Sequence, residues 1–268
     1  MTTEPTTPRA GATADWTPRP GGAPWLQQVR AQASMEARLM LRNGEQLLLA
    51  VVIPVIVLVG AVQGADRIDL DLTGRAIDVF TPGVLALAVM STAFTSLAIA
   101  TGFERRYGVI KRLGTSPLPR SGLLAGKVGA LVAVEALQVA VISAVALVMG
   151  WEPAGGPAAV VGAALAVLLG TAAFAALGLF LAGSLRAEAT LAAANLVYLL
   201  LMAGGAVVLP ASAYGAFGDV VRWLPSGALG GAMRDALIDG VVAPVALLTL
   251  AGWAVVGTVL TARTFKWE

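Results

Sequence analysis

The sequence predicts an all-α polytopic membrane protein with six transmembrane helices, an N-terminal amphipathic interfacial helix and re-entrant outer helices before the last span. The first observation is composition: 57% of the 268 residues are hydrophobic and 13% are charged, whereas a soluble domain usually carries about 25% charged residues. The second is clustering, because the apolar residues form runs long enough to cross a bilayer, roughly 17 to 25 residues each. The third is a densely basic segment between two apolar runs, which is typical of a loop retained in the cytoplasm.

Cysteine and histidine are both absent from the sequence. Their absence excludes thiolate and imidazole metal sites, cysteine nucleophiles, histidine-ligated haem and a Ser-His-Asp triad. Disulfide bonds are excluded as well, so cysteine usage does not indicate the redox compartment.

The N-terminal region, residues 1–23, is rich in Thr, Pro and Gly, and we expect a disordered cytoplasmic tail. It lacks the apolar core of a signal peptide, so the first span is expected to anchor the chain. Residues 24–43 then carry apolar side chains at helical spacing, and Pro24 suits the first turn of a helix. Two interpretations remain open for this helix: it lies along the inner leaflet, or it extends the first span into the cytoplasm.

Residues 24–268 form the predicted membrane domain. The basic segment 103–121 separates the second and third spans and is expected to be a cytoplasmic loop. Residues 210–240 hold five charged residues beside interfacial aromatic side chains, so we expect short outer helices that dip into the membrane without crossing it. The six expected spans are 46–62, 79–102, 122–150, 158–183, 191–209 and 241–262.

The distribution of charge sets the expected orientation. The outer segments contain eight acidic residues and only four of the 18 basic residues, which leaves 18 − 4 = 14 basic residues on the inner side. An even number of spans with both termini in the cytoplasm therefore satisfies the positive-inside rule.

No phosphate-binding loop of the form G-x-x-x-x-G-K-[ST] occurs in the sequence. The nearest stretch, residues 121–128, has Ser121 in place of the first Gly and Val128 in place of the metal-binding hydroxyl. It also opens a span instead of following a strand. If ATP drives this protein, the ATPase is expected to be another chain.

The basic segment has a physical interpretation of its own. Residues 103–113 can continue the second span as a helix into the cytoplasm; Gly114 would end that helix, and Pro117 and Pro119 would prevent its continuation. Such a rigid helix could transmit a push from a soluble partner to the spans, or the segment could simply set topology, and both interpretations stay open. One face of the helix is expected to hold Tyr107, Ile110 and Gly114.

The segment Glu104-Arg105-Arg106-Tyr107-Gly108, with Lys111-Arg112-Leu113, Thr115-Ser116-Pro117, Arg120 and Gly126-Lys127, resembles the cytoplasmic-loop signature of type-2 ATP-binding-cassette exporter permeases. The daunorubicin-resistance-like branch is the most similar. Tyr107 stands where a basic residue is common in the family, and Val109 where Thr is common. The span number, the amphipathic N-terminal helix and the segment Trp223-Leu224-Pro225 with Met233-Arg234-Asp235-Ala236-Leu237 extend the resemblance over most of the chain.

The resemblance implies a half-size permease that pairs with a second permease, identical or not, and with nucleotide-binding ATPase subunits. No cofactor is expected on this chain, since ATP and Mg would bind the partner ATPase; membrane lipid is an expected partner and nucleic acid is not. Glu104 and Arg105 would be the most sensitive contacts with the ATPase, and Gly108 would allow close approach. The full set implied to couple the chain to the ATPase is Glu104, Arg105, Arg106, Gly108, Lys111, Arg112 and Leu113.

Polar residues inside the predicted spans have two interpretations each. Glu135 and Gln138 either face the translocation path or form a structural hydrogen-bonded pair near the inner leaflet. Asn195 and Tyr198 share one helical face, where they either line a cavity at the dimer interface or hydrogen-bond a neighbouring helix.

The leading functional hypothesis is a transmembrane permease subunit that exports a hydrophobic or amphipathic solute, such as a drug, lipid or glycolipid. The alternative is a non-transporting assembly or sensor subunit that binds a cytoplasmic partner through residues 103–121. A secondary transporter usually needs several buried ionisable groups, and only Glu135 lies well inside a span. Abundant Arg, Ala and Gly with little Lys indicate a GC-rich bacterium, so we expect the cytoplasmic membrane of a bacterium.

Overall fold

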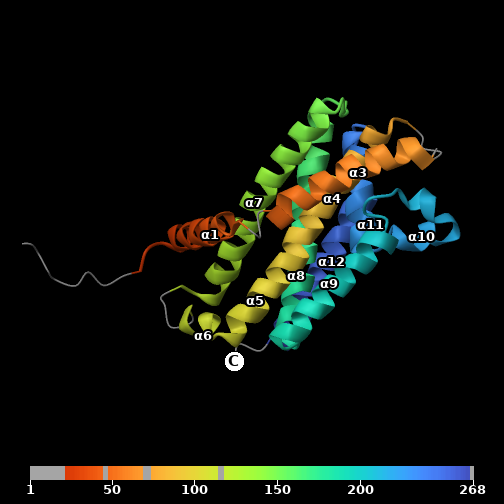
Figure 1. Cartoon of the computed structure of the whole chain (residues 1–268). Helices are drawn as coiled ribbons and strands as arrows, with labels where there is room; N and C mark the ends of the chain where they lie inside the picture. The colour runs from red at the N-terminus through yellow and green to blue at the C-terminus, as the bar shows by residue number, and fades with distance from the viewer. Residues whose placement is uncertain (1–21, 45–47, 69–73, 114–117, 266–268) are drawn as a thin grey trace, which may run out of the picture.

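The computed structural model describes residues 22–44, 48–68, 74–113 and 118–265, and every regular element in these ranges is helical (Figure 1). The chain is an all-helical polytopic membrane protein, as the sequence predicts. A shorter apolar helix, Ala50–Ala65, precedes five helices that are long and apolar enough to cross a membrane. Those five are Ala76–Arg106, Ser121–Val148, Pro157–Ser184, Ala187–Gly204 and Pro244–Thr264.

The first half of the chain contributes α1 (Trp25–Arg42), the π-helical η1 (Leu48–Val52), α3 (Ile53–Ile68), α4 (Ala76–Met90), the π-helical η2 (Ser91–Ser96), α5 (Leu97–Arg106), α6 (Val109–Leu113) and α7 (Arg120–Val148). The second half contributes α8 (Pro157–Ser184), α9 (Ala187–Gly204), the 3₁₀-helical η3 (Ala211–Phe217), α10 (Gly218–Val221), α11 (Pro225–Leu237) and α12 (Pro244–Thr264). Because α4, η2 and α5 follow one another without a break, they act as one long helix.

The continuous helix α4–η2–α5 forms the centre of the bundle. Its apolar window is 72% buried, against 17% for the windows of α9 and α12. At its midpoint the ring of Phe94 meets the ring of Phe174 on α8 edge to face, with centroids 6.3 Å apart, a favoured arrangement for aromatic pairs. The end of α5 is therefore continuous with a helix that lies in the core.

Helix α1 is a separate helix that packs across α7 and projects sideways from the bundle (Figure 1). Its end is defined, because Asn43 has an extended backbone (φ −83°, ψ 93°). The sequence left open whether α1 is a continuous extension of the first span. The helix end at Asn43 does not match that interpretation. Residues 45–47, where that span was predicted to begin, lie outside the described residues.

The fifth span differs most from its predicted limits of 191–209. Helix α9 begins at Ala187 and ends at Gly204, and residues 205–209 continue without helical structure. The polar groups of α11 account for this: Ser226 Oγ donates to the Gly205 carbonyl at 2.8 Å, and Arg234 donates to the carbonyls of Ala206 and Val207. Hydrogen bonds from a neighbouring element thus replace those that helix continuation would have made.

The segment 210–240 folds as η3, α10 and α11, and α11 packs against α4 and α8. Its C-terminal end lies beside the α7–α8 turn, where the Ala154 N–H donates to the Leu237 carbonyl at 2.8 Å. Since α7 begins next to α6 and ends at this turn, the α11–α12 connection and α6 lie at opposite ends of the bundle.

Candidate functional site

The structure breaks the helix that the sequence predicts over residues 103–113. Helix α5 ends at Arg106, and Tyr107 and Gly108 form a turn before α6 begins at Val109. Gly108 has φ of +68°, a left-handed conformation that non-glycine residues rarely adopt. A Cβ there would meet nothing of this chain within 4 Å, so the turn requires glycine and the surface beside it is open.

Tyr107 and Ile110 consequently point to different sides, although the sequence places them on one face. Tyr107 is 63% exposed and stacks on Phe103, while Ile110 is 4% exposed. The predicted third member of that face, Gly114, lies outside the described residues. We refer to residues 103–113 as the α5–α6 tip.

The inner side of the α5–α6 tip is held by a buried lysine. Lys127, in the first turns of α7, lies 2.9 Å from a carboxylate oxygen of Glu36 on α1 and 2.8 Å from one of Glu104 on α5. Its side chain is 5% exposed, and those of Glu36 and Glu104 are 15% and 22% exposed. One cation therefore joins three helices, and the three side chains line a cavity of about 200 Å³.

Gly126, the residue before Lys127, allows this arrangement. A Cβ at position 126 would lie 2.5 Å from Cγ of Gln32 on α1, so only glycine lets α1 approach α7 this closely. Gln32 in turn donates to Glu36 at 2.9 Å. The Gly126-Lys127 pair, which the sequence shows only as the start of a span, is thus the contact point of α1, α5 and α7.

Two arginines attach the α5–α6 tip to the opposite side of the bundle. Arg105 is half-buried and donates to the Ala182 carbonyl near the end of α8. Arg106 forms an ion pair with Glu188 at the start of α9 and lies over the ring of Tyr107, 5.8 Å from its centroid. The tip is therefore tied to α8 and α9 as well as to α1 and α7.

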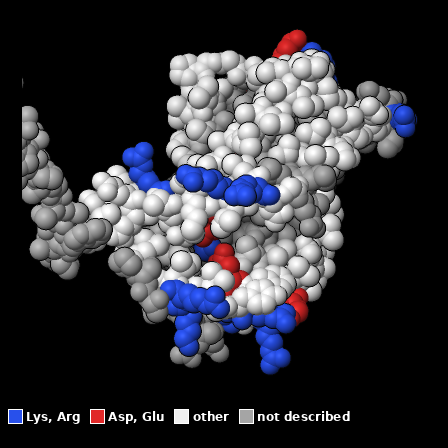
Figure 2. All heavy atoms as spheres, turned by 60° about the vertical axis from the view of Figure 1, so that its left-hand side comes forward, with Lys and Arg blue, Asp and Glu red and all other residues white. Residues whose placement is uncertain are grey.

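The outer side of the α5–α6 tip is exposed and basic. Arg106, Lys111 and Arg112 are exposed, and Leu113 is half-buried. Figure 2 shows basic side chains grouped at this end of the molecule, with acidic side chains in a hollow beside them. Of the seven residues that the sequence singles out, Glu104 and Arg105 face the bundle, Gly108 forms the turn and the others remain towards the surface.

Gln138 and Glu135 on α7 are fully buried but do not form the hydrogen-bonded pair considered above. Gln138 donates to the Ala50 carbonyl in η1 at 2.7 Å and shares a hydrogen bond with Thr92 in η2. Glu135 shares a hydrogen bond with Thr171 on α8. Gln138 therefore joins both π-helical segments, and π-helical turns often mark functional positions.

Comparison with known proteins gives the family. The ABC-2 type transporter model matches residues 27–237, which is most of the chain. The chain belongs to the ABC-2 type transporter family. A search of curated proteins finds no match.

Membership in the ABC-2 type transporter family explains why the sequence contains no ATP-binding loop. An ABC-2 membrane chain is the permease, not the ATPase subunit, and such permeases pair with nucleotide-binding subunits. In agreement, the stretch 121–128 that most resembles a phosphate-binding loop is helical and belongs to α7.

The remaining predicted residues of this ABC-2 type permease lie on α9. Asn195 is exposed, whereas Tyr198 is half-buried and shares a hydrogen bond with Ser91 in η2. Tyr198 thus has the interhelical partner that one of its two interpretations requires. Helix α9 also presents exposed leucines at positions 191, 196, 199 and 200.

Proposed function

We propose that this ABC-2 type permease exports a hydrophobic or amphipathic solute of the drug, lipid or glycolipid class, driven by a separate ATPase that seats the α5–α6 tip. The resemblance of residues 104–127 to the daunorubicin-resistance-like loop supports this finer assignment. ATP and Mg²⁺ bind the partner, and this chain supplies no catalytic group. The tip and both termini face the cytoplasm of a bacterium, and a second permease completes the path.

The proposal depends on one observation: one side of the α5–α6 tip is exposed and basic, and the other is bonded to the bundle. One side exposes Lys111 and Arg112 to solvent, which suits a groove of opposite charge on a soluble partner. The other side is tied by Glu104 and Arg105 to α7 and α8. A force applied to the exposed side therefore reaches the central helix, and with it α7 and α8, through the two-residue turn Tyr107–Gly108.

This division of roles revises which residues of the tip are expected to touch the ATPase. Glu104 and Arg105 position the tip, because their side chains are occupied by Lys127 and the Ala182 carbonyl. Lys111 and Arg112 on the five-residue helix α6 make the contact. Mutations in α6 should then weaken binding of the ATPase, and mutations of Glu104 or Arg105 should weaken transmission of its movement to the bundle.

Reversing both charges of α6, in Lys111→Glu/Arg112→Glu, should lower ATP-driven transport at least tenfold while leaving membrane insertion unchanged. Like charge facing an acidic groove costs several kcal/mol, and both side chains are exposed. The measurement is transport and ATP hydrolysis in liposomes that contain the permease with its nucleotide-binding ATPase subunit.

Arg263→Glu, at the exposed C-terminal end of α12, is the matched control, because it reverses one charge at the same end of the molecule outside the tip. Normal transport by the α6 double variant would refute the contact. A complex that hydrolyses ATP but moves no solute in the wild type would favour the non-transporting alternative.

A further inference from the structure

Glu135 lies near the midpoint of α7 without a cation beside it. Its side chain is 0% exposed. The nearest cation on the same helix is Lys127, eight residues earlier, which is a rise of about 12 Å at 1.5 Å per residue. That lysine already lies between Glu36 and Glu104. Its ammonium group therefore does not offset a negative charge on Glu135.

The elements packed against α7 offer no charged side chain at this level. They are α1, α3, α4, α8 and the two π-helical segments. None of η1, η2 and α8 contains an Asp, Glu, Lys or Arg. The charged residues of the other three stand near the two ends of the bundle, at the crossing of α1 with the first turns of α7 (Arg30, Glu36, Arg38 and Arg42) and where α3 ends and α4 begins (Asp66, Arg67 and Asp78). A buried carboxylate without a compensating charge is strongly disfavoured in hydrocarbon.

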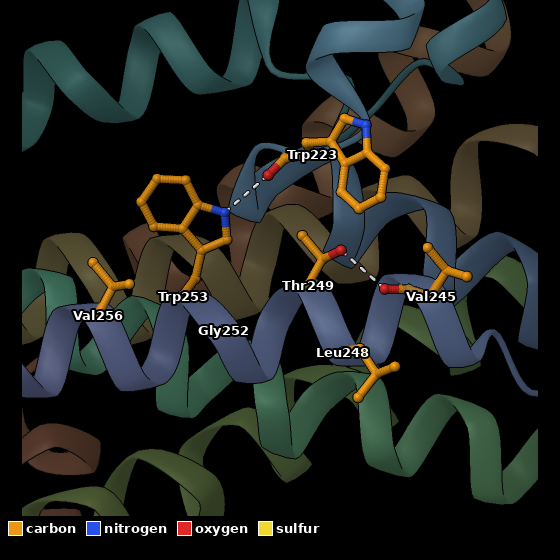
Figure 3. Close-up of a pocket in the computed structure, with 7 residues that line it drawn as sticks. All are labelled: Trp223, Val245, Leu248, Thr249, Gly252, Trp253 and Val256. Carbon is orange, nitrogen blue, oxygen red and sulfur yellow. Dashed lines mark hydrogen bonds between the residues drawn. The ribbon is translucent and has the colours of Figure 1, made fainter.

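Thr171 on α8 shows where a proton lies. Its hydroxyl oxygen is within hydrogen-bonding distance of a carboxyl oxygen of Glu135 and of the Val167 carbonyl. A threonine hydroxyl has a single hydrogen, and helical threonines often give it to the carbonyl four residues earlier, as Thr249 does to Val245 at 2.9 Å (Figure 3). An ionised carboxylate is an acceptor only, so Thr171 cannot donate to it and to Val167 at once. Both contacts are satisfied when a protonated Glu135 donates to Thr171 and Thr171 donates to Val167.

The other carboxyl oxygen of Glu135 agrees with this assignment. Oε1 is buried and has no hydrogen-bond partner among the described residues. Leaving a charged oxygen unpartnered in a buried site costs more than leaving a neutral carbonyl oxygen unpartnered. A neutral carboxyl group therefore fits both oxygens better than a carboxylate does.

We propose that Glu135 is a proton-binding site: at neutral pH its carboxyl group is protonated, and this proton joins α7 to Thr171 on α8. Glu135 is then a neutral hydrogen-bond donor and not a charged contact for a solute. Because a carboxylate needs water or a cation around it, the proton leaves only when α7 and α8 part far enough to admit water. Separation of the two helices at this level therefore releases a proton. The inference depends on neither the partner ATPase nor the transported solute.

Proton release on unfolding counts the bound proton. An exposed glutamate has a pKa of about 4.3 and is ionised at about pH 7, so unfolding exposes Glu135 and frees its proton. We expect the wild type to release one more proton per chain than Glu135→Gln when the purified full chain is unfolded in detergent. The measurement uses a weakly buffered solution and a pH-indicator dye. Glu188→Gln is the control, because that side chain is 64% exposed at the start of α9, and it should release as many protons as the wild type.

Infrared spectroscopy of the folded protein tests where the proton goes. The C=O stretching band of a protonated carboxyl group lies apart from the carboxylate bands, and a detergent without ester groups keeps that region clear. We expect Glu135→Gln to lose one such band and Thr171→Val to shift it to higher frequency, because a valine side chain accepts no hydrogen bond. Equal proton release by the wild type and Glu135→Gln, or an unchanged band in Glu135→Gln, would overturn the proton site. An unchanged band in Thr171→Val would overturn donation to Thr171, and that variant keeps Glu135, so it decides the question even if Glu135→Gln does not fold.

Discussion

Replacing Lys127 with methionine should lower the free energy of unfolding by about 3 to 5 kcal/mol, the usual cost of removing one partner from a buried ion pair. Methionine fills much of the same volume, so the loss is electrostatic. Glu36 and Glu104 would then face each other across a cavity of about 200 Å³ without the cation that now lies within 2.9 Å of each. The measurement is unfolding of the purified protein in detergent, followed by tryptophan fluorescence.

The same argument predicts how the loss can be reversed. Adding Glu36→Gln and Glu104→Gln to Lys127→Met removes all three charges, and neutral replacements of buried ion pairs are often well tolerated. The triple variant should therefore recover most of the lost stability. Lys111→Met on exposed α6 serves as the control and should change stability by less than about 0.5 kcal/mol. A single Lys127→Met variant as stable as the wild type would show that the lysine does not join the helices.

If the ion cluster of Glu36, Glu104 and Lys127 positions the α5–α6 tip, a variant can recover stability without recovering transport. The triple variant keeps the fold but loses the charged link between α1, α5 and α7. We therefore expect it to hydrolyse ATP with the partner while transporting poorly, because the tip is no longer fixed to the bundle. This distinguishes a positioning role from a purely structural one.

The apolar runs determine most of the helices, because a residue inside hydrocarbon must satisfy its backbone within the helix. They could not indicate how the α5–α6 tip is built. Glu104 and Lys127 are 23 residues apart, and nothing in their spacing reveals that Lys127 meets both Glu104 and Glu36. A glycine at position 108 does not by itself reveal the turn that interrupts the helix, which is shown by its positive φ.

The early end of α9 has a different cause. Hydropathy continues without interruption from Gly204 through Leu209, so an apolar pattern cannot distinguish a helix from a buried extended segment. The distinction lies in Ser226 and Arg234, whose side chains bind three successive carbonyls of that segment. The sequence offers only an arginine 27 residues after Val207, and it carries no indication of its partners.

Replacing Arg234 with methionine should accordingly destabilise the protein by about 2 to 5 kcal/mol, since an unpaired buried polar group costs about 1 to 3 kcal/mol. The guanidinium is 8% exposed and donates to the carbonyls of Ala206 and Val207 at 3.2 and 2.9 Å. Both acceptors are buried and would lose this donor. Arg222→Met is the control, because that side chain is 59% exposed and its partners, Asp219 and the Trp223 ring, are exposed too. Equal stability of the two variants would contradict the role of Arg234.

Two adjacent glycines on α11 provide an independent test of the same contact. A Cβ at Gly230 would lie 2.6 Å from the Val207 carbonyl oxygen and 2.9 Å from an Arg234 nitrogen, whereas a Cβ at Gly231 would meet nothing within 4 Å. Gly230→Ala should push residues 206–207 away from α11 and lower the unfolding temperature. Gly231→Ala should leave it unchanged or raise it, because alanine favours the helix by about 1 kcal/mol. The opposite order of the two variants would mean that α11 does not hold the end of α9, and that the extended segment is stabilised from another side.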